Sequence, residues 1–411
     1  MTDVSDTGFK SVTRVDEARE RLLSAADPVE RTDRLPLEQA VGRALAEPVA
    51  ARRNVPHYAR AAMDGYAVRA EDTFSASDRS PAVLSEGDSP GPNSAVRVHT
   101  GSALPDGADA VVIVEETERV EGRSADDGTA ELEVFDAVAE GENVAPVGED
   151  VSEGQALFDP GHRLRPSDLG LLKSTGIDAV QVYDRPTVGV VPTGEELVQR
   201  DPDPGEVIET NGLTVSQYVR RWGGTPTYRE VVTDDERALR AALERDLTKD
   251  VVVTTGGSSV GERDLIPEVV DDLGEVLVHG IALKPGHPCA LGVVRDTPVV
   301  MLPGYPVACI VNAVQFLRPL VKALGHLPRE PHPAREARLT RKVRSEPGVR
   351  TFVRVATEEG EDGLEATPTR ASGSGVLSSV ALADGWVVVE EDREGIPEGE
   401  IVSVEDWEYA P

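Results

Sequence analysis

Cysteine and histidine are scarce in this chain of 411 residues, which contains two cysteines and seven histidines. Cys289 and Cys309 form no C-x-x-C pair, and the histidines show no paired spacing of the kind that metal ligands need. These absences argue against a disulfide-stabilised scaffold and against a zinc site.

Lysine is also rare: the chain has six lysines beside 74 acidic residues, and its net charge is −32. Acidic residues are spread over the whole length, a composition that suggests adaptation to high salt. It argues against nucleic acid or an anionic membrane as a partner, because both bind to basic surfaces. Local positive groups must therefore hold any anionic substrate.

The sequence shows neither a leader peptide nor a long apolar run. Its first ten residues, MTDVSDTGFK, are acidic and polar, unlike a signal peptide. The longest apolar stretches are shorter than the ~20 residues that a membrane span requires. We therefore expect a cytoplasmic protein.

The most informative stretch is VVVTTGGSSVGERDLIPEVV, residues 251–270. Its apolar start is typical of a strand buried on both faces, and the pattern after Asp264 has helical spacing. The glycines and serines between them predict a loop whose backbone amides bind an anion such as phosphate. An ordinary tight turn of an α/β protein is an equally good interpretation of the loop alone.

Strands and helices alternate from about residue 186, which predicts a mainly parallel sheet covered by helices on both sides. Ligands of such sheets bind beyond the carboxyl ends of the strands. Three loops are expected at that edge: PTGEEL, TTGGSSVGERD and LPGYPVA.

The rest of the chain is predicted to form smaller units. A helical linking domain is expected from residues 11–45 together with 146–183, and a β-rich domain from residues 46–145. The central α/β domain is expected at 184–327, and a small C-terminal β domain at 333–411. Residues 328–338, rich in Pro, Arg and Glu, are expected to be a linker, and 121–129 the polar tip of a hairpin.

Taken alone, the isolated acidic residues have simple structural explanations. Asp64 in AMDGYAV precedes a glycine and is interpreted as a hairpin-turn residue. Asp150 lies in a glycine-flanked turn, and Asp234 or Asp235 is expected to cap a helix.

Eight motifs in order give the chain a specific resemblance: AMDGYAV, TGSALPDGADAVV, VGEDV, PTGEEL, ETNG, TTGGSSVGERD, LKPGHP and LPGYPVA. Almost from end to end, the chain resembles the molybdopterin molybdenumtransferase (MoeA) family, which is similar to the gephyrin E domain. The resemblance implies a central three-layer, MogA-like α/β/α domain, a β-rich second domain and a C-terminal β-barrel-like domain.

The resemblance also implies a reaction. The family takes adenylylated molybdopterin, releases AMP with the help of Mg²⁺, and inserts the metal from molybdate. It forms an elongated homodimer whose site lies between the central domain of one subunit and the second domain of the other. Further partners that the resemblance implies are a molybdopterin adenylyltransferase and the oxidoreductases that accept the cofactor.

Candidate site residues follow from matching the motifs. The catalytic candidates are Asp64, Thr100, Glu196, Asp264 and Lys284. The substrate-binding candidates are Gly256, Gly257, Ser258, Ser259, Gly261, Pro303, Pro306, Asp234, Asp235, Arg350 and Ser374. The metal-binding candidates are Asp264, Glu196 and Asp150, because carboxylate oxygens are the ligands that Mg²⁺ prefers. Pro306 has a structural explanation as well, as the first residue of a long helix.

The sequence departs from the family pattern at two positions. His287 replaces the second lysine of a KPGKP motif, so its charge depends on pH, and Tyr305 stands where PGNP is frequent. Both positions flank the implied oxyanion site, which leaves open tungstate instead of molybdate, or a paralogue with altered activity.

Two other functions are compatible with parts of the sequence. A molybdopterin adenylyltransferase shares the central domain but needs neither AMDGYAV nor VGEDV. A non-catalytic scaffold like the gephyrin relative would not need the carboxylates or GGSSVGERD.

Overall fold

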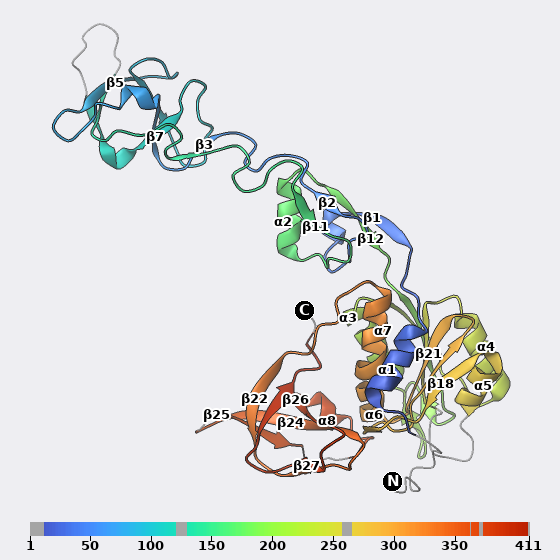
Figure 1. Cartoon of the computed structure of the whole chain (residues 1–411). Coiled ribbons are helices and arrows are strands. Elements are labelled where there is room, and N and C mark those ends of the chain that lie inside the picture. The colour runs from blue at the N-terminus through green and yellow to red at the C-terminus, as the bar shows by residue number, and fades with distance from the viewer. Residues whose placement is uncertain (1–11, 121–129, 257–264, 362, 370–372, 410–411) are drawn as a thin grey trace.

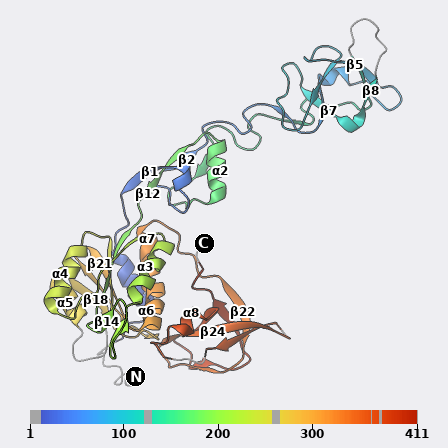
Figure 2. The same cartoon turned by 180° about the vertical axis from the view of Figure 1, so that it is seen from behind.

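The computed structural model describes residues 12–120, 130–256, 265–361, 363–369 and 373–409. The chain is elongated (Figure 1). An α/β body and a barrel lie at one end, a β-rich body lies at the other, and a narrow linking part joins them. The view from behind shows the same arrangement (Figure 2).

The α/β body is built on a six-stranded sheet with the strand order β16-β13-β17-β21-β20-β18. The strands are β13 (Thr187–Pro192), β16 (Thr225–Tyr228), β17 (Val251–Thr255), β18 (Glu275–His279), β20 (Ala290–Val294) and β21 (Thr297–Leu302). The first four in this order pair in parallel, and β20 and β18 continue the sheet antiparallel. The mainly parallel sheet is therefore as predicted, whereas β20 was not predicted.

Helices cover both faces of this sheet, because its strands carry apolar side chains on both. Val251 and Val253 pack toward α1 (Val15–Ser24), α3 (Asn211–Arg221), α6 (Pro306–Asn312) and α7 (Arg318–Leu324). Val252, between them, packs toward α4 (Glu236–Asp246) and α5 (Leu265–Leu273) on the opposite face. This confirms the three-layer prediction. The first helix, although predicted with the linking domain, contributes its buried side chains to the central core.

The helical segment Pro306–Leu324 is continuous through a π-helical turn, η4 (Ala313–Leu317). With 19 residues and a mean hydropathy of 1.5, it is long and apolar enough to cross a membrane. The expectation that no stretch of this kind exists was therefore wrong. Because 83% of its 18-residue apolar window is buried within the protein, it is a helix of the core.

The β-rich body contains a six-stranded sheet with the order β7-β4-β6-β5-β9-β8. The strands are β4 (Gly65–Val68), β5 (Ala82–Glu86), β6 (Ser94–Val98), β7 (Ala110–Ile113), β8 (Thr117–Val120) and β9 (Glu131–Val134). Short turns η2 (Ala70–Asp72) and η3 (Val114–Glu116) interrupt it. β8 and β9 pair antiparallel, and the tip predicted between them, 121–129, lies outside the described residues.

The linking part is crossed twice by the chain, once in each direction. β1 (Thr32–Pro36) pairs with β12 (Ala179–Tyr183), and β2 (Val49–Ala50) pairs with β11 (Ala156–Phe158). The remaining elements are η1 (Leu37–Gln39), α2 (Pro166–Ser174) and the pair β3 (Arg60–Ala61) with β10 (Val144–Ala145), which leads into the β-rich body.

The C-terminal part is a closed five-stranded barrel. Its strands are β22 (Ala334–Leu339), β24 (Arg350–Gly360), β25 (Gly363–Pro368), β26 (Gly385–Val389) and β28 (Ile401–Glu405), and the β24–β26 pairing closes the circle. Smaller elements are α8 (Ser378–Ala381) and the pair β23 (Val343–Arg344) with β27 (Gly395–Ile396). The linker predicted at 328–338 was wrong from residue 334 on, because Ala337 is buried as part of β22.

Candidate functional site

The strand ends from which the three predicted loops start lie side by side at the carboxyl edge of the central sheet. The backbone N–H of Thr193, after β13, donates to the carbonyl of Thr255 at 3.0 Å. The N–H of Gly256, after β17, donates to the carbonyl of Leu302 at 3.1 Å. Asn211 at the start of α3 donates through Nδ2 to the carbonyl of Gly304 at 2.6 Å. The three strand ends are thereby fixed to one another.

Gly256 is required at this edge for two reasons. Its φ of +120° lies in the region that favours glycine, and a Cβ there would approach the carbonyl oxygen of Thr193 to 2.1 Å. The candidates Gly257, Ser258, Ser259, Gly261 and Asp264 follow it in the sequence and lie outside the described residues.

The other acidic candidates near this edge are exposed. Glu196 follows β13, and its backbone carbonyl accepts from Val207 in a small parallel pair, β14 (Leu197–Val198) with β15 (Val207–Ile208). Asp235 caps α4 by accepting a hydrogen bond of 3.0 Å from the N–H of Ala238. Asp234 lies beside it in the same connection. Asp235 therefore has the structural role that the sequence offered as an alternative.

A cleft of about 640 Å³ opens between the central body and the barrel. The loop 283–288 and Tyr305 form one wall, and the barrel strands form the other. Lys284, His287, Lys342, Arg344 and Arg354 line it, and Glu346 is its only carboxylate among the described residues. In a chain of net charge −32 this is a locally cationic site, and its size is typical of small-molecule pockets.

Lys284 extends from β19 (Leu283–Lys284) and contacts Glu346 through a 2.8 Å hydrogen bond. That hydrogen bond, together with the positive charge of Lys284, lowers the pKa of Glu346. His287 stands on the same loop, and its Nδ1 lies 3.2 Å from the carbonyl oxygen of Leu283.

The substrate-binding candidate Arg350 and the neighbouring Arg354 differ in their positions relative to the cleft. Arg350 is not among the lining residues, and it forms a bidentate pair with Asp16 of α1 at 2.9 and 3.0 Å. Arg354, four residues further along β24 on the same face, lines the cleft and is only 6% exposed. Burial lowers its pKa. A charged residue flanked by the apolar residues Phe352, Val353 and Val355 is the signal that could have identified it.

The remaining candidates near the cleft differ in their roles. Ser374 lines it, and its carbonyl accepts a 3.0 Å hydrogen bond from Val307, which ties a barrel loop to the start of α6. Pro303 follows β21 and Pro306 occupies the first turn of α6, and neither lines the cleft. Tyr305, between them, does line it and is 60% exposed.

Asp64 and Thr100 form a second, separate constellation in the β-rich body. One carboxylate oxygen of Asp64 accepts hydrogen bonds from the Thr100 N–H at 2.6 Å and from its hydroxyl at 2.8 Å. Both hydrogen bonds lower the pKa of Asp64, and the bond from the Thr100 backbone has the larger effect. Asp64 does not sit in a hairpin, because β3 and β4 on either side of it do not pair with each other. The β-rich body lies at the far end of the chain from the cleft (Figures 1 and 2).

A magnesium site is not apparent in the described part of one chain. No three His, Cys, Asp or Glu side chains gather there closely enough to hold a metal ion. Asp150 lies where the linking part meets the β-rich body, and its N–H donates to the carbonyl of Val55 at 2.9 Å. It is therefore not brought to the sheet edge near Glu196 within the same chain.

Family models match nearly the whole chain. The MoeA N-terminal region (domain I and II) matches residues 13–176, a probable molybdopterin binding domain matches 189–323, and the MoeA C-terminal region (domain IV) matches 336–407.

Full-length relatives agree with these matches. A putative molybdopterin biosynthesis protein of Methanocaldococcus jannaschii is 36% identical over 398 residues, covering 94% of each chain. The molybdopterin molybdenumtransferase of Bacillus subtilis is 33% identical, covering 95% of this chain and 93% of that protein. A solved structure of the molybdopterin biosynthesis moeA protein from Pyrococcus horikoshii is 35% identical, with a TM-score of 0.81 and coverage of 97% and 99%.

These findings place the protein in a class, the transferase enzymes that build the molybdenum cofactor. Within that class, the chain belongs to the molybdopterin molybdenumtransferase (MoeA) family.

Proposed function

We propose that this protein transfers molybdenum from molybdate to adenylylated molybdopterin, with release of AMP. The observation that carries the proposal is the concentration of Lys284, Lys342, Arg344 and Arg354 in one cleft of a strongly acidic chain. An oxyanion is attracted to such a site by charge, and guanidinium groups offer it paired N–H donors. Molybdate is the family's substrate, and its tetrahedral oxyanion fits this chemistry.

The adenylylated substrate is proposed to lie along the sheet edge, from the loop after β17 toward the cleft. Glycine at position 256 lets the backbone approach a ligand closely there. In the proposed reaction water cleaves the phosphoanhydride bond of the substrate and AMP leaves. The two dithiolene sulfurs then replace two oxygens of molybdate, which leave as water with the thiol protons and two protons from solvent, so the metal keeps its oxidation state. The residues of the cleft hold and orient the oxyanion.

Magnesium dependence is part of the proposal, and it rests on the family resemblance. The carboxylates proposed for the ion are Asp264 and Glu196 of one chain with Asp150 of a second chain, since carboxylate oxygens suit a hard divalent cation. When bound, the ion would offset the negative charge of the phosphoanhydride.

We further propose that the working form is a homodimer. The two hydrogen bonds from Thr100 hold the exposed carboxylate of Asp64 in one orientation. It lies far from the cleft of its own chain, so a second copy is needed to bring it to a cleft.

The cellular setting is proposed on composition and resemblance. We propose a cytoplasmic protein adapted to high salt, which receives its substrate from a molybdopterin adenylyltransferase and passes the cofactor to oxidoreductases. The charge of −32 fits the first part, because salt screens the repulsion between acidic groups.

The test is AMP release from adenylylated molybdopterin in high salt, with Mg²⁺ or EDTA and with molybdate or tungstate added separately. We expect release that depends on Mg²⁺ and molybdate. Release with tungstate as well would show that His287 and Tyr305 do not set metal selectivity. Consumption of ATP without AMP release from the adenylylated substrate would instead identify an adenylyltransferase, and binding without turnover a scaffold.

A further inference from the structure

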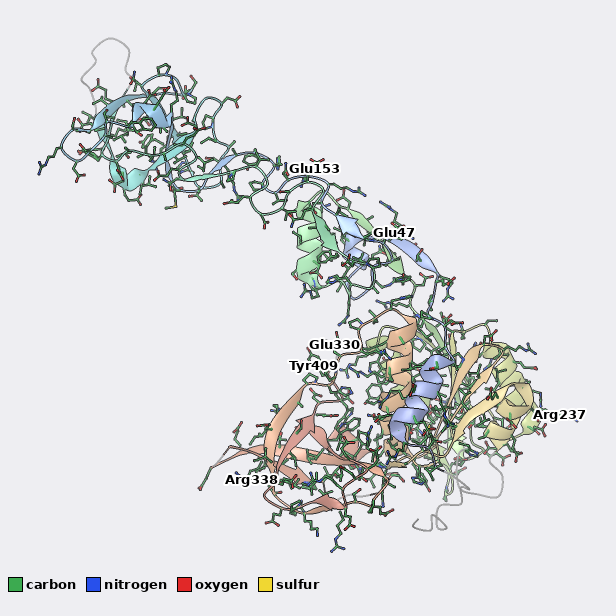
Figure 3. The ribbon with its side chains drawn as sticks, in the orientation of Figure 1. Glu47, Glu153, Arg237, Glu330, Arg338 and Tyr409 are labelled. Carbon is green, nitrogen blue, oxygen red and sulfur yellow. The ribbon has the colours of Figure 1, made fainter. Side chains whose placement is uncertain are left out.

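A second group of cations surrounds a small hollow where the linking part, the central body and the end of the chain meet. The hollow has a volume of about 30 Å³, and Arg163, Arg221, Arg318 and Lys322 line it. The other lining residues are Gly42, Trp222, Gly223, Leu327 and Tyr409, so no carboxylate is among the described lining residues. Figure 3 places Glu330 and Tyr409 at this junction.

The four cations come from three separate parts of the chain. Arg163 belongs to the linking part, where backbone bonds between residues 42–45 and 161–164 fix its position. Arg221 ends α3, and Arg318 and Lys322 stand one turn apart on α7. An occupant of the hollow would therefore touch two bodies of the protein at once.

Bringing these groups together has an electrostatic cost. Lys322 is only 6% exposed, and burial together with the positive charges of Arg318 and Arg163 lowers its pKa. Glu330 offsets part of this cost by accepting a 3.0 Å hydrogen bond from Lys322, and its backbone carbonyl accepts from Arg318 at 2.7 Å. Glu408 pairs with Arg221 at 2.5 Å. These carboxylates bind the cations from outside the hollow.

We propose that the hollow is a binding site for one small monovalent anion, of the halide class, which links the linking part to the central body. A space of ~30 Å³ accepts a single small ion or a water molecule. It is too small for the adenylyl or pterin groups of the proposed substrate, so the site is independent of the reaction. A halide accepts several N–H donors at once and neutralises charge in a place where burial strengthens the interaction.

The first experiment is crystallisation of the full-length protein from sodium bromide, with diffraction data collected at the bromine absorption edge. We expect an anomalous peak in the hollow, within contact distance of the Arg163 and Arg318 guanidinium groups. Ordinary water density without an anomalous peak would overturn the proposal.

The second experiment measures thermal unfolding in sodium chloride and in sodium gluconate at equal sodium concentration. Gluconate is too large for the hollow, so chloride should raise the melting temperature of the wild type relative to gluconate, by about 2 °C. Arg163→Gln should abolish this increment, because half-buried Arg163 supplies the linking part's contact to the ion.

The matched control is Arg237→Gln, which makes the same charge change at an exposed position on α4, far from the hollow (Figure 3). It should keep the chloride increment in full. If chloride raised the melting temperature equally in the wild type, Arg163→Gln and Arg237→Gln, the proposal that an anion links the two bodies would be refuted, even if bromide were seen in crystals.

Discussion

The side-chain amide of Asn312 donates a 3.0 Å hydrogen bond to the carbonyl oxygen of Gly286, at the centre of the cleft loop. The same Nδ2 lies 2.8 Å from the carbonyl of Ala308 on its own helix. Asn312 is fully buried and stands immediately before the π-helical turn η4. A π turn inside an α-helix is frequent at functional sites, and here it follows the residue that holds the loop of Lys284 and His287.

Replacing Asn312 with alanine should loosen that loop. Loss of the buried hydrogen bonds should lower the free energy of unfolding by about 2 kcal/mol and raise the KM for molybdate. The control is Thr73→Val, which removes a buried hydroxyl that bonds to the Ala70 carbonyl in the β-rich body. That variant should lose stability without a change in KM. If the two variants gave the same KM, Asn312 would have only a structural role.

The two arginines of β24 are expected to behave differently when each is changed to glutamine. Arg354→Gln should raise the KM for molybdate about tenfold or more, since a buried charged donor in the cleft is lost. Arg350→Gln should leave KM unchanged but lower stability by about 1 kcal/mol, because the ion pairs with Asp16, Glu390 and Glu391 are broken. Steady-state kinetics and urea unfolding of both variants measure these effects. The reverse pattern would restore Arg350 as the substrate residue.

The proposed dimer can be tested by mixing two variants, each of which is impaired when molybdate is limiting. Asp64→Asn removes a carboxylate from the β-rich body, and Arg354→Gln removes a cation from the cleft. If each site combines residues of two chains, refolding the variants together gives heterodimers with one intact site. The mixture should then recover roughly one quarter of wild-type activity. No recovery, from a mixture that forms heterodimers, would place both residues in the site of a single chain.

Stability at acid pH should depend on Asp168. Burial of this carboxyl opposes its ionisation, but hydrogen bonds from Arg165 and His162 outweigh that effect and lower its pKa from 3.8 to about 2. Because the pKa is lowered in the folded protein, the stabilisation is complete above the unfolded value. It is lost as the pH falls from about 4 to about 2, and amounts to about 2 kcal/mol. Urea unfolding across this range should show a smaller loss for Asp168→Asn than for the wild type.

The sequence predicted the central fold well because its signals are local. Val251–Thr255 is apolar at every position, as a strand covered on both faces must be. β20 was missed because Ala290 and Gly292 have low strand propensity, and its place in the sheet depends on pairing with β18 and β21.

The site was less predictable because several of its features depend on contacts between distant segments. Arg350 reaches Asp16, which is 334 positions away in the sequence, so no local pattern indicates that this arginine is already paired. Motif matching named Lys284 and Ser374, which the structure places in the cleft. It could not show that Asp64 and Thr100 lie far from them within one chain.

The two-residue strand β19 has a consequence for how the cleft can move. It pairs in parallel with Arg350 and Thr351 of β24, so the cleft loop and the barrel share backbone hydrogen bonds at one end of the cleft. Because the two walls of the cleft are hydrogen-bonded to each other through this pairing, they cannot move apart independently at that end. Opening of the cleft would therefore take place away from β19, near Tyr305 and Ser374, while the pairing with β24 holds the backbone of Lys284 against the barrel. Selection among oxyanions would then depend on the spacing between the cleft loop and the barrel, which the backbone pairing of β19 with β24 sets before any substrate binds.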